Sequence, residues 1–289
     1  MTDKKNILVT GANGQMGMEF RELAPSYPHY NFLLTSQEDL DIIDVESVKG
    51  FFAKDQIHFC INCAAYTAVD KAETEKDFAM LVNGTAVGNL AAVCEEHHSQ
   101  LIHISTDYVF DGNACTPYTE DTPPDPINYY GETKLRGEQL AFQNDPSAII
   151  IRTSWLYSFY GHNFVRSMMR LMSQHETIGV VNDQWGCPTY ASDLANAIME
   201  IVESEKWKVE SGIFHYSNNG KTTWFEFATS IKEFINSNCG VYPISSSEYK
   251  TAAKRPSYSV MDTRKIRKAF GIRADDWKTA LEKCIRKYQ

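Results

Sequence analysis

The sequence lacks the features that would assign it to several specialised protein classes. No stretch approaches the roughly 18 continuous apolar residues of a membrane-spanning helix, and residues 1–6 lead into a strand-like segment instead of the apolar region of a secretion signal. Basic residues are few, because 28 Lys and Arg stand against 37 Asp and Glu, giving a net charge of −9 with no dense basic block. A nucleic-acid binder usually carries a basic stripe, and an acidic protein binds anionic membranes poorly. We therefore expect neither nucleic acid nor membrane as a partner.

Cysteine is sparse as well. Seven cysteines, an odd number scattered over 289 residues, do not resemble a disulfide framework and favour a reducing cytoplasm. Cys60-Ile61-Asn62-Cys63 is a C-x-x-C motif, but a zinc site would need a second Cys or His pair, and a redox motif would lie at the start of a helix. This motif lies in an expected strand, so the sequence predicts no metal site.

What the sequence does contain is a globular composition, with 43% hydrophobic and 22% charged residues, in one large or two ordinary domains. In the first half, strand and helix patterns alternate, which predicts right-handed crossovers and a parallel sheet in a doubly wound α/β domain. The expected strands are residues 6–10, 31–35, 58–63, 101–105 and 148–152, and the expected helices are residues 14–24, 45–54, 77–97 and 130–142. The second half is less regular, with helices expected at 163–173, 191–205, 224–236, 263–270 and 277–288 and a strand at 213–216.

A glycine-rich turn joins the first expected strand to the first expected helix. Residues 10–17 read TGANGQMG, which places Gly11, Gly14 and Gly17 at G-x-x-G-x-x-G spacing. In a dinucleotide-binding site such glycines allow a tight turn, close approach to a pyrophosphate and close packing of helix on strand; an ordinary βα turn is the alternative. The second expected strand ends at Thr35-Ser36-Gln37 without the acid or arginine that would distinguish NADH from NADPH, so both cofactors stay open.

Tyr130 and Lys134 form a Y-x-x-x-K pair at the expected start of a helix. Residues four apart share a helix face, and a lysine cation near a phenol lowers the pKa of the tyrosine, which would suit Tyr130 to proton transfer. A solvated helix face is the alternative. The context favours chemistry, because Ser105 and Thr106 end a parallel strand, where ligands bind in open α/β sheets. Asn83 stands out as an isolated polar residue in an apolar helix.

These motifs occur in an order that resembles the extended short-chain dehydrogenase/reductase superfamily. Longer segments resemble one family within it, the dTDP-4-dehydrorhamnose reductases, over nearly the whole chain. The segments that carry the resemblance are residues 65–73 (AYTAVDKAE), 105–112 (STDYVFDG), 130–138 (YGETKLRGE), 152–155 (RTSW) and 182–189 (NDQWGCPT), with the pair Arg255-Pro256.

The resemblance implies roles for the residues that match the family's motifs. Tyr130 and Lys134 would be the catalytic tyrosine and lysine, and Thr106 the hydroxyl that holds the substrate carbonyl. The residues implied to bind the cofactor are Gly11, Asn13, Gly14, Gln15 and Met16 at the pyrophosphate, Asp41 and Ile42 beside the adenine, and Ala64, Ala65, Tyr66 and Thr67 along its length, together with Tyr130 and Lys134. Those implied to line the sugar-nucleotide site are Val69, Thr106, Asp107, Tyr108 and Trp155. Arg255 could hold a diphosphate bidentately; a surface arginine is the alternative.

The implied fold is a Rossmann-like doubly wound parallel sheet with a smaller C-terminal substrate-binding lobe. Residues 1–155 would form the NAD(P)-binding domain and residues 156–289 mainly the substrate-binding lobe, with segments near 191–218 returning to the first domain. The implied reaction is reduction of the C4 ketone of dTDP-4-dehydro-β-L-rhamnose to dTDP-L-rhamnose, a precursor of cell-surface polysaccharide, by NADPH or NADH.

Two other assignments stay open at this point. A non-catalytic, NADP-binding regulatory subunit of the same superfamily, such as that of methionine adenosyltransferase, would share the fold, although the intact Thr106, Tyr130 and Lys134 argue against it. A nucleotide-sugar epimerase or dehydratase would use the same scaffold and retain its NAD. Some family members are Mg²⁺-linked dimers through glutamates, of which only Glu19 has a match here. No metal is therefore expected, and a homodimer is left open.

Overall fold

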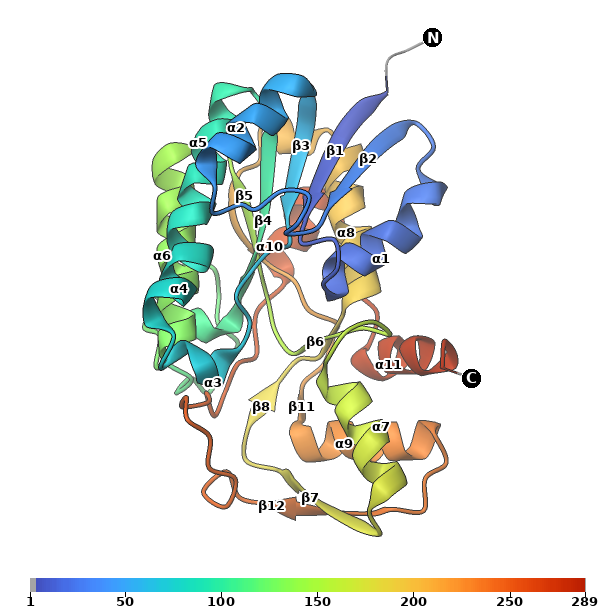
Figure 1. Cartoon of the computed structure of the whole chain (residues 1–289). Coiled ribbons are helices and arrows are strands. Elements are labelled where there is room, and N and C mark those ends of the chain that lie inside the picture. Colours follow the sequence, from blue (N-terminus) through green and yellow to red (C-terminus); the bar gives the residue numbers. More distant parts are fainter. Residues whose placement is uncertain (1–3, 289) are drawn as a thin grey trace.

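The computed structural model describes residues 4–288 as a large lobe built on a six-stranded sheet and a smaller lobe below it (Figure 1). The strands of the large sheet run parallel in the order β10-β5-β4-β3-β1-β2. Their bounds are β1 (Lys5–Thr10), β2 (Tyr30–Thr35), β3 (Ile57–Asn62), β4 (Gln100–Thr106), β5 (Ile149–Thr153) and β10 (Gly212–His215). The strand order reverses between β1 and β3, and ligands of such sheets bind beyond the carboxyl ends of the strands at this point. The predicted fold class is confirmed.

Helices cover both faces of this sheet. On one face lie α1 (Gln15–Leu23), α8 (Ala191–Glu203) and α10 (Arg264–Phe270), and on the other lie α2 (Val45–Lys54), α5 (Ala86–Glu96) and α6 (Tyr129–Asn144). Successive residues of β1 point to opposite faces, so Ile7 and Val9 join the core under α1 and α8, whereas Leu8 joins the core under α2 and α5. A strand buried on both faces needs a continuous apolar run, which is why this segment could be recognised from the sequence.

The helix expected at residues 77–97 is interrupted. It follows the short helix α3 (Val69–Ala72) and consists of α4 (Lys76–Met80), a π turn at Leu81–Thr85 and α5. The stretch Lys76–Glu96 is long and apolar enough to cross a membrane by length and composition alone, but 61% of its apolar window is buried inside the protein. There α5 packs on α6, so the hydrophobicity of this stretch is that of a core helix.

The smaller lobe holds α7 (Phe164–Gln174), α9 (Trp224–Phe234) and α11 (Trp277–Arg286) around a core rich in aromatic residues. Three two-stranded sheets accompany them, namely β6 (Leu156–Tyr157) with β9 (Thr189–Tyr190), β7 (Thr177–Val181) with β12 (Gly240–Ile244), and β8 (Trp185–Gly186) with β11 (Thr222–Thr223). The sequence did not predict these strands, because four of the six have only two residues and carry no alternation of their own.

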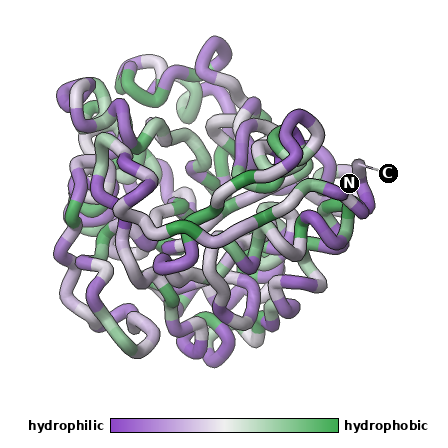
Figure 2. Tube along the Cα trace, turned by 90° about the horizontal axis from the view of Figure 1, so that it is seen from below, coloured by the Kyte–Doolittle hydropathy of each residue, from purple (hydrophilic) through white to green (hydrophobic). Residues whose placement is uncertain are grey.

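The chain passes between the lobes more than once (Figure 1). After β9, α8 packs on α1 and β10 pairs with β5, so that residues 191–215 lie in the large lobe. The division of the chain near residue 155 stays a prediction. Seen from below, hydrophobic segments run through the middle of the molecule, and hydrophilic turns lie at its periphery (Figure 2).

Candidate active site

The glycine-rich turn after β1 lies against the end of β3. Gly11 adopts a φ of +67°, and a Cβ atom there would lie 2.8 Å from the backbone N of Ala64. A Cβ atom on Gly17 would clash with the backbone of Ala12, so α1 packs on the turn without room for a side chain. Helix α1 begins directly after Gly14, and no side chain caps its first N–H groups. These groups are available to an anion.

A cavity of about 500 Å³ opens at this turn and extends past the ends of β2 and β3. Its lining contains the predicted cofactor residues Gly11, Asn13, Gly14, Asp41, Ile42, Ala64, Ala65, Tyr66 and Thr67, and residues that were not predicted, among them Gln37, Glu38, Phe78 and Val82. Gln15 and Met16 are not part of the lining: Gln15 accepts a hydrogen bond from Asn163, and Met16 is buried in the core. The volume suits a small-molecule ligand, and the glycine cradle fits the pyrophosphate of a dinucleotide.

The first turn of α6 carries Tyr130. Asn128 caps this helix by accepting a hydrogen bond from the N–H of Gly131 at 2.9 Å, and a Cβ atom on Gly131 would clash with the carbonyl oxygen of Tyr108. This close contact brings Tyr130 beside the turn that follows β4. Its ring lies edge-on to Tyr108, with 5.5 Å between the centroids, and its hydroxyl is near enough to the side chain of Thr106 for that side chain to influence its pKa.

Burial controls the protonation of the groups at this turn. Burial and the nearby Asp107 carboxylate raise the pKa of Tyr130, and the Thr106 hydroxyl opposes this shift. Burial also raises the pKa of Asp107 to about 7, and the nearby hydroxyls of Ser259 and Thr106 oppose this shift; the Thr106 hydroxyl donates to Oδ1 at 3.0 Å. The Lys134 amino group is directed at the carbonyl oxygen of Ile104 in β4, and the expectation that it lowers the pKa of Tyr130 stays a prediction. Tyr130 is therefore a protonated phenol at neutral pH, which is the form that can donate a proton.

The amino group of Lys134 is buried against β4. Nζ donates to the carbonyl oxygen of Ile104 at 2.7 Å and lies 3.2 Å from Nε2 of His103. The polar contacts continue on the other side of the His103 ring, where Nδ1 lies 3.0 Å from Nδ2 of Asn62. Oδ1 of Asn62 in turn accepts a hydrogen bond from the Thr10 hydroxyl at 2.7 Å. A buried polar chain thus connects Lys134 with the last residue of β1. His103 and Thr10 were not predicted as site residues from the sequence. Each is a polar residue in an otherwise apolar core strand, and this is the signal that could have identified them, because buried polar groups need hydrogen-bond partners.

Asn83, the isolated polar residue of the apolar helix, lies in the π turn. Its Oδ1 accepts from the N–H of Tyr66 at 2.8 Å, and its Nδ2 donates to the carbonyl oxygen of Tyr66 and to the hydroxyl of Thr133, both at 3.0 Å. Tyr66 lines the cavity and Thr133 lies on α6. Asn83 therefore fixes the cavity wall to the helix that carries Tyr130.

Several residues implied to bind substrate lie beside α6. Val69, Tyr108 and Tyr130 belong to one apolar cluster. Arg255 is close enough to act electrostatically on Tyr108, but its guanidinium is already ion-paired with Asp70, at 2.8 Å between Nη2 and Oδ2. A diphosphate at Arg255 would therefore compete with this carboxylate.

Trp155 lies apart from that cluster. It adopts a φ of +48° between β5 and β6 and stacks on Trp224 with ring centroids 3.5 Å apart and planes 8° from parallel. A Cβ atom on Gly186 would clash with the Trp155 ring. The structure thus places Trp155 against the aromatic core of the smaller lobe.

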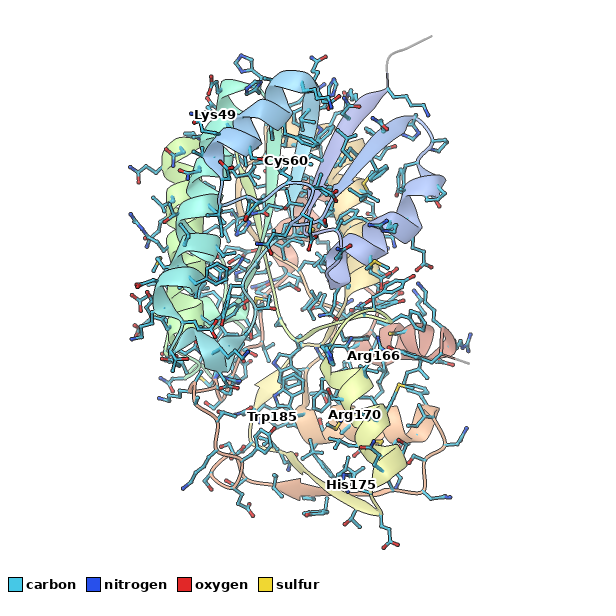
Figure 3. All side chains as sticks on the ribbon, in the orientation of Figure 1. Lys49, Cys60, Arg166, Arg170, His175 and Trp185 are labelled. Carbon is cyan, nitrogen blue, oxygen red and sulfur yellow. The ribbon has the colours of Figure 1, made fainter. Side chains whose placement is uncertain are left out.

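The C-x-x-C motif shows no sign of reactivity. Cys60 is fully buried in β3, in the middle of the large sheet (Figure 3), and burial raises the pKa of Cys63. A thiol that stays protonated is a poor nucleophile and metal ligand. Within residues 4–288, no three His, Cys, Asp or Glu side chains are grouped so that they could hold a metal ion.

Comparison with known proteins identifies the family. The family model described as RmlD substrate binding domain matches residues 5–289. A dTDP-4-dehydrorhamnose reductase of Aggregatibacter actinomycetemcomitans is 38% identical over 98% of both chains, and a dTDP-4-keto-6-deoxy-D-glucose reductase of Streptomyces niveus is 39% identical over 97% of this chain and 96% of the relative. The crystal structure of a dTDP-4-dehydrorhamnose reductase of Bacillus anthracis in complex with NADP is 38% identical, with coverages of 98% and 99% and a TM-score of 0.93. Because these matches run almost from end to end, the chain belongs to the RmlD family and is an NAD(P)H-dependent nucleotide-sugar reductase of that type.

Proposed function

We propose that this reductase converts dTDP-4-dehydro-β-L-rhamnose into dTDP-L-rhamnose by reducing the C4 ketone, with NADPH or NADH as the reductant. The observation that carries the proposal is the grouping of Thr106, Tyr130 and Lys134 between the end of β4 and the start of α6. Tyr66, which lines the cavity, packs in the same cluster as Tyr130. The name of the Aggregatibacter relative supports the choice of sugar, and the NADP in the Bacillus anthracis structure supports the class of cofactor.

The chain's own part in the reaction is to hold and protonate the carbonyl oxygen. The hydroxyls of Thr106 and Tyr130 would bond this oxygen, where negative charge develops. When bound, the reduced nicotinamide supplies the hydride that C4 accepts. Tyr130, which burial keeps protonated, would give its phenolic proton to the oxygen. Lys134 would hold the nicotinamide ribose, and Asp107 would accept a hydrogen bond from a sugar hydroxyl.

We assign the cavity at the glycine turn to the cofactor. Gly11, Asn13, Gly14 and the backbone of Gln15 and Met16 would hold the pyrophosphate, Asp41 and Ile42 would flank the adenine, and residues 64–67 would follow the rest of the molecule. Val69, Tyr108, Trp155 and Arg255 would face the sugar nucleotide. Residues 1–155, with the returning segment 191–218, would form the cofactor domain, and the rest of 156–289 the substrate-binding lobe. The seven cysteines are free, which supports a cytoplasmic location.

The residue after Asp107 favours reduction over dehydration of the sugar. Removing water across C5 and C6 needs an acid and a base in the same site. Asp107 supplies one carboxyl group, but the next residue is Tyr108, and burial raises the pKa of its phenol. A phenol that stays protonated is a poor base for a carbon acid at neutral pH. Tyr108 would instead pack against the sugar.

Product analysis with the purified protein tests the proposal. dTDP-4-dehydro-β-L-rhamnose should consume NADPH or NADH and give dTDP-L-rhamnose, with the configuration at C4 read by NMR. dTDP-4-keto-6-deoxy-D-glucose, for which the Streptomyces relative is named, should be reduced at least about 10-fold more slowly, the discrimination that a few pocket contacts provide. Faster reduction of the D-sugar would contradict the proposal, as would formation of a 4-keto-6-deoxy sugar from dTDP-glucose. Nicotinamide that survives dialysis in stoichiometric amount would favour an epimerase or dehydratase.

A further inference from the structure

His103 lies deep in β4 at a place where the proposed chemistry calls for no histidine. Its side chain has no exposed surface, its Nε2 faces Lys134 and its Nδ1 faces Asn62. Burial and the neighbouring Lys134 hold the pKa of His103 well below its ordinary value. The ring is therefore neutral and donates through only one nitrogen. Which nitrogen carries the proton decides how His103 acts on Lys134.

The orientation of the Asn62 amide fixes that proton. The backbone N–H of Ala64, which can only donate, lies 3.2 Å from Oδ1 of Asn62, and the Thr10 hydroxyl lies 2.7 Å from the same atom. A distance of 2.7 Å is typical of O–H···O and short for N–H···O. If the amide were reversed, its NH₂ group and the Ala64 N–H would face each other as two donors. Oδ1 therefore points to Ala64 and Thr10, and Nδ2 donates to Nδ1 of His103.

The proton of the neutral ring is then on Nε2, directed at Lys134. We infer that His103 is a positioning residue that donates a hydrogen bond to Nζ of Lys134 and thereby stabilises the uncharged amine of this lysine. An ammonium group has three donors and no acceptor, whereas an amine has a lone pair that can accept the Nε2–H. The inference rests on the proposed function, since it concerns the lysine that we assign to the cofactor ribose.

Other influences around Lys134 shift its pKa either in the same direction as His103 or in the opposite direction. Burial is the largest influence and lowers the pKa of Lys134 to about 8. Glu138, one turn further along α6, and Cys63, at the end of β3, act in the opposite direction and raise it. Lys134 therefore loses its positive charge as the pH rises through about 8, which is within the pH range of an ordinary enzyme assay. Because the ammonium binds ribose hydroxyls more strongly than the amine, cofactor affinity should fall as the pH rises through about 8.

The tautomer of His103 can be observed directly in the full-length protein without any ligand. In ¹⁵N spectra of histidine-labelled protein, His103 should show an unprotonated Nδ1 and a protonated Nε2, and should stay neutral below the pH at which an ordinary histidine becomes protonated. His103→Gln identifies the signal by its loss; should that variant not fold, Lys134→Met identifies it by its shift. A proton on Nδ1 would overturn the inference, because Nε2 would then accept from a lysine cation.

The second measurement is the pH dependence of the dissociation constants of NADH and NADPH, together with that of kcat/KM. His103→Leu removes the Nε2–H that stabilises the amine of Lys134, so the ammonium is favoured relative to the wild type. The decline of affinity and of kcat/KM at high pH should therefore move upward by about one pH unit. His215→Leu is the matched control, since it replaces another fully buried histidine, in β10, and should leave the pH of the decline unchanged. A profile of His103→Leu that coincides with the wild type, or moves downward, would overturn the inference.

The two proposals fail separately. If the cofactor-binding profile shifts as described but the dTDP-4-keto sugar is not reduced, the proposed substrate is wrong and the role of His103 stands. If the sugar is reduced but neither the tautomer nor the shift is found, the role of His103 is wrong and the proposed substrate stands.

Discussion

At the scale of single residues, the proposed chemistry depends most directly on the phenol of Tyr130. Tyr130→Phe keeps the ring and its edge-on contact with Tyr108, so the dissociation constant of the cofactor should not change. The kcat should fall about 10²–10⁴-fold, which is typical for the loss of a positioned proton donor. Tyr129→Phe is the matched control, because the neighbouring ring packs under Lys76 instead. A near-normal kcat for Tyr130→Phe would remove the basis for its assignment.

Single residues also show how far the site could be predicted from the sequence. Tyr130 and Lys134 could be found because their spacing is fixed along one helix. This spacing does not determine which groups the flexible lysine side chain contacts. The chain behind Lys134 depends on strand pairing: Thr10 lies opposite Asn62, and Asn62 lies opposite His103. These residues are distant in the sequence and become neighbours only when β1, β3 and β4 assemble, so no local pattern contains them.

At the scale of elements, the connection from β2 to α2 bears on the choice of cofactor. Gln37, Glu38 and Asp41 of this connection line the cavity, and its lining within the described chain contains no Lys or Arg. The 2′-phosphate of NADPH carries up to two negative charges and is usually accommodated by an arginine at this position of the fold. We therefore expect NADH to bind more tightly than NADPH, by a margin that narrows as salt is added.

Fluorescence titration of both nucleotides at low and high salt measures this preference. Gln37→Arg should tighten NADPH binding by about 10-fold, the equivalent of one favourable charged hydrogen bond, with little effect on NADH. Ser47→Arg adds the same charge on the exposed face of α2, outside the lining, and should change neither constant by a comparable amount. Tighter binding of NADPH than NADH by the unmodified protein would contradict the expectation.

Elements differed in how well the sequence predicted them. Strands buried on both faces and helices with an apolar stripe carry their own signal, and their predicted ranges agree with β1 to β5 and with α2, α6 and α8 to within a few residues. The two-residue strands of the smaller lobe have no such signal, because pairing between distant segments alone defines them. The π turn at Leu81–Thr85 was not predicted for a related reason. Asn83 in this turn hydrogen-bonds to Tyr66 and Thr133, which lie outside its own helix, so the local sequence pattern does not contain these partners.

At the scale of the whole molecule, a buried neutral histidine makes stability depend on pH. His215 is fully buried in β10, where burial, aided by the Arg152 cation, lowers its pKa to about 3 from the ordinary histidine value of about 6.5. Between these values the unfolded chain binds a proton at this position and the native protein does not. The contribution of His215 to the free energy of unfolding is therefore constant above pH 6.5 and declines as the pH falls toward about 3.

Comparison of His215→Gln with the wild type isolates this contribution from all other titrating groups. The free energy of unfolding of the variant, relative to the wild type, should rise by about 1.4 kcal/mol for each pH unit below the histidine's ordinary pKa. Urea unfolding at several pH values from about 7 to 4 gives both free energies. A difference that does not vary with pH would show that His215 is protonated equally in both states.

The pairing of β10 with β5 has a consequence for the chain while it is still being made. Ile149–Thr153 leaves the ribosome well before Gly212–His215, its neighbour in the sheet. At a synthesis rate of roughly 5–20 residues per second, the nascent protein carries an open apolar strand edge for on the order of several seconds. Such an edge is a template for aggregation. A ribosome that stalls between these two strands would thus expose a large sheet that lacks its closing strand, and chaperones would have to shield it until translation resumes.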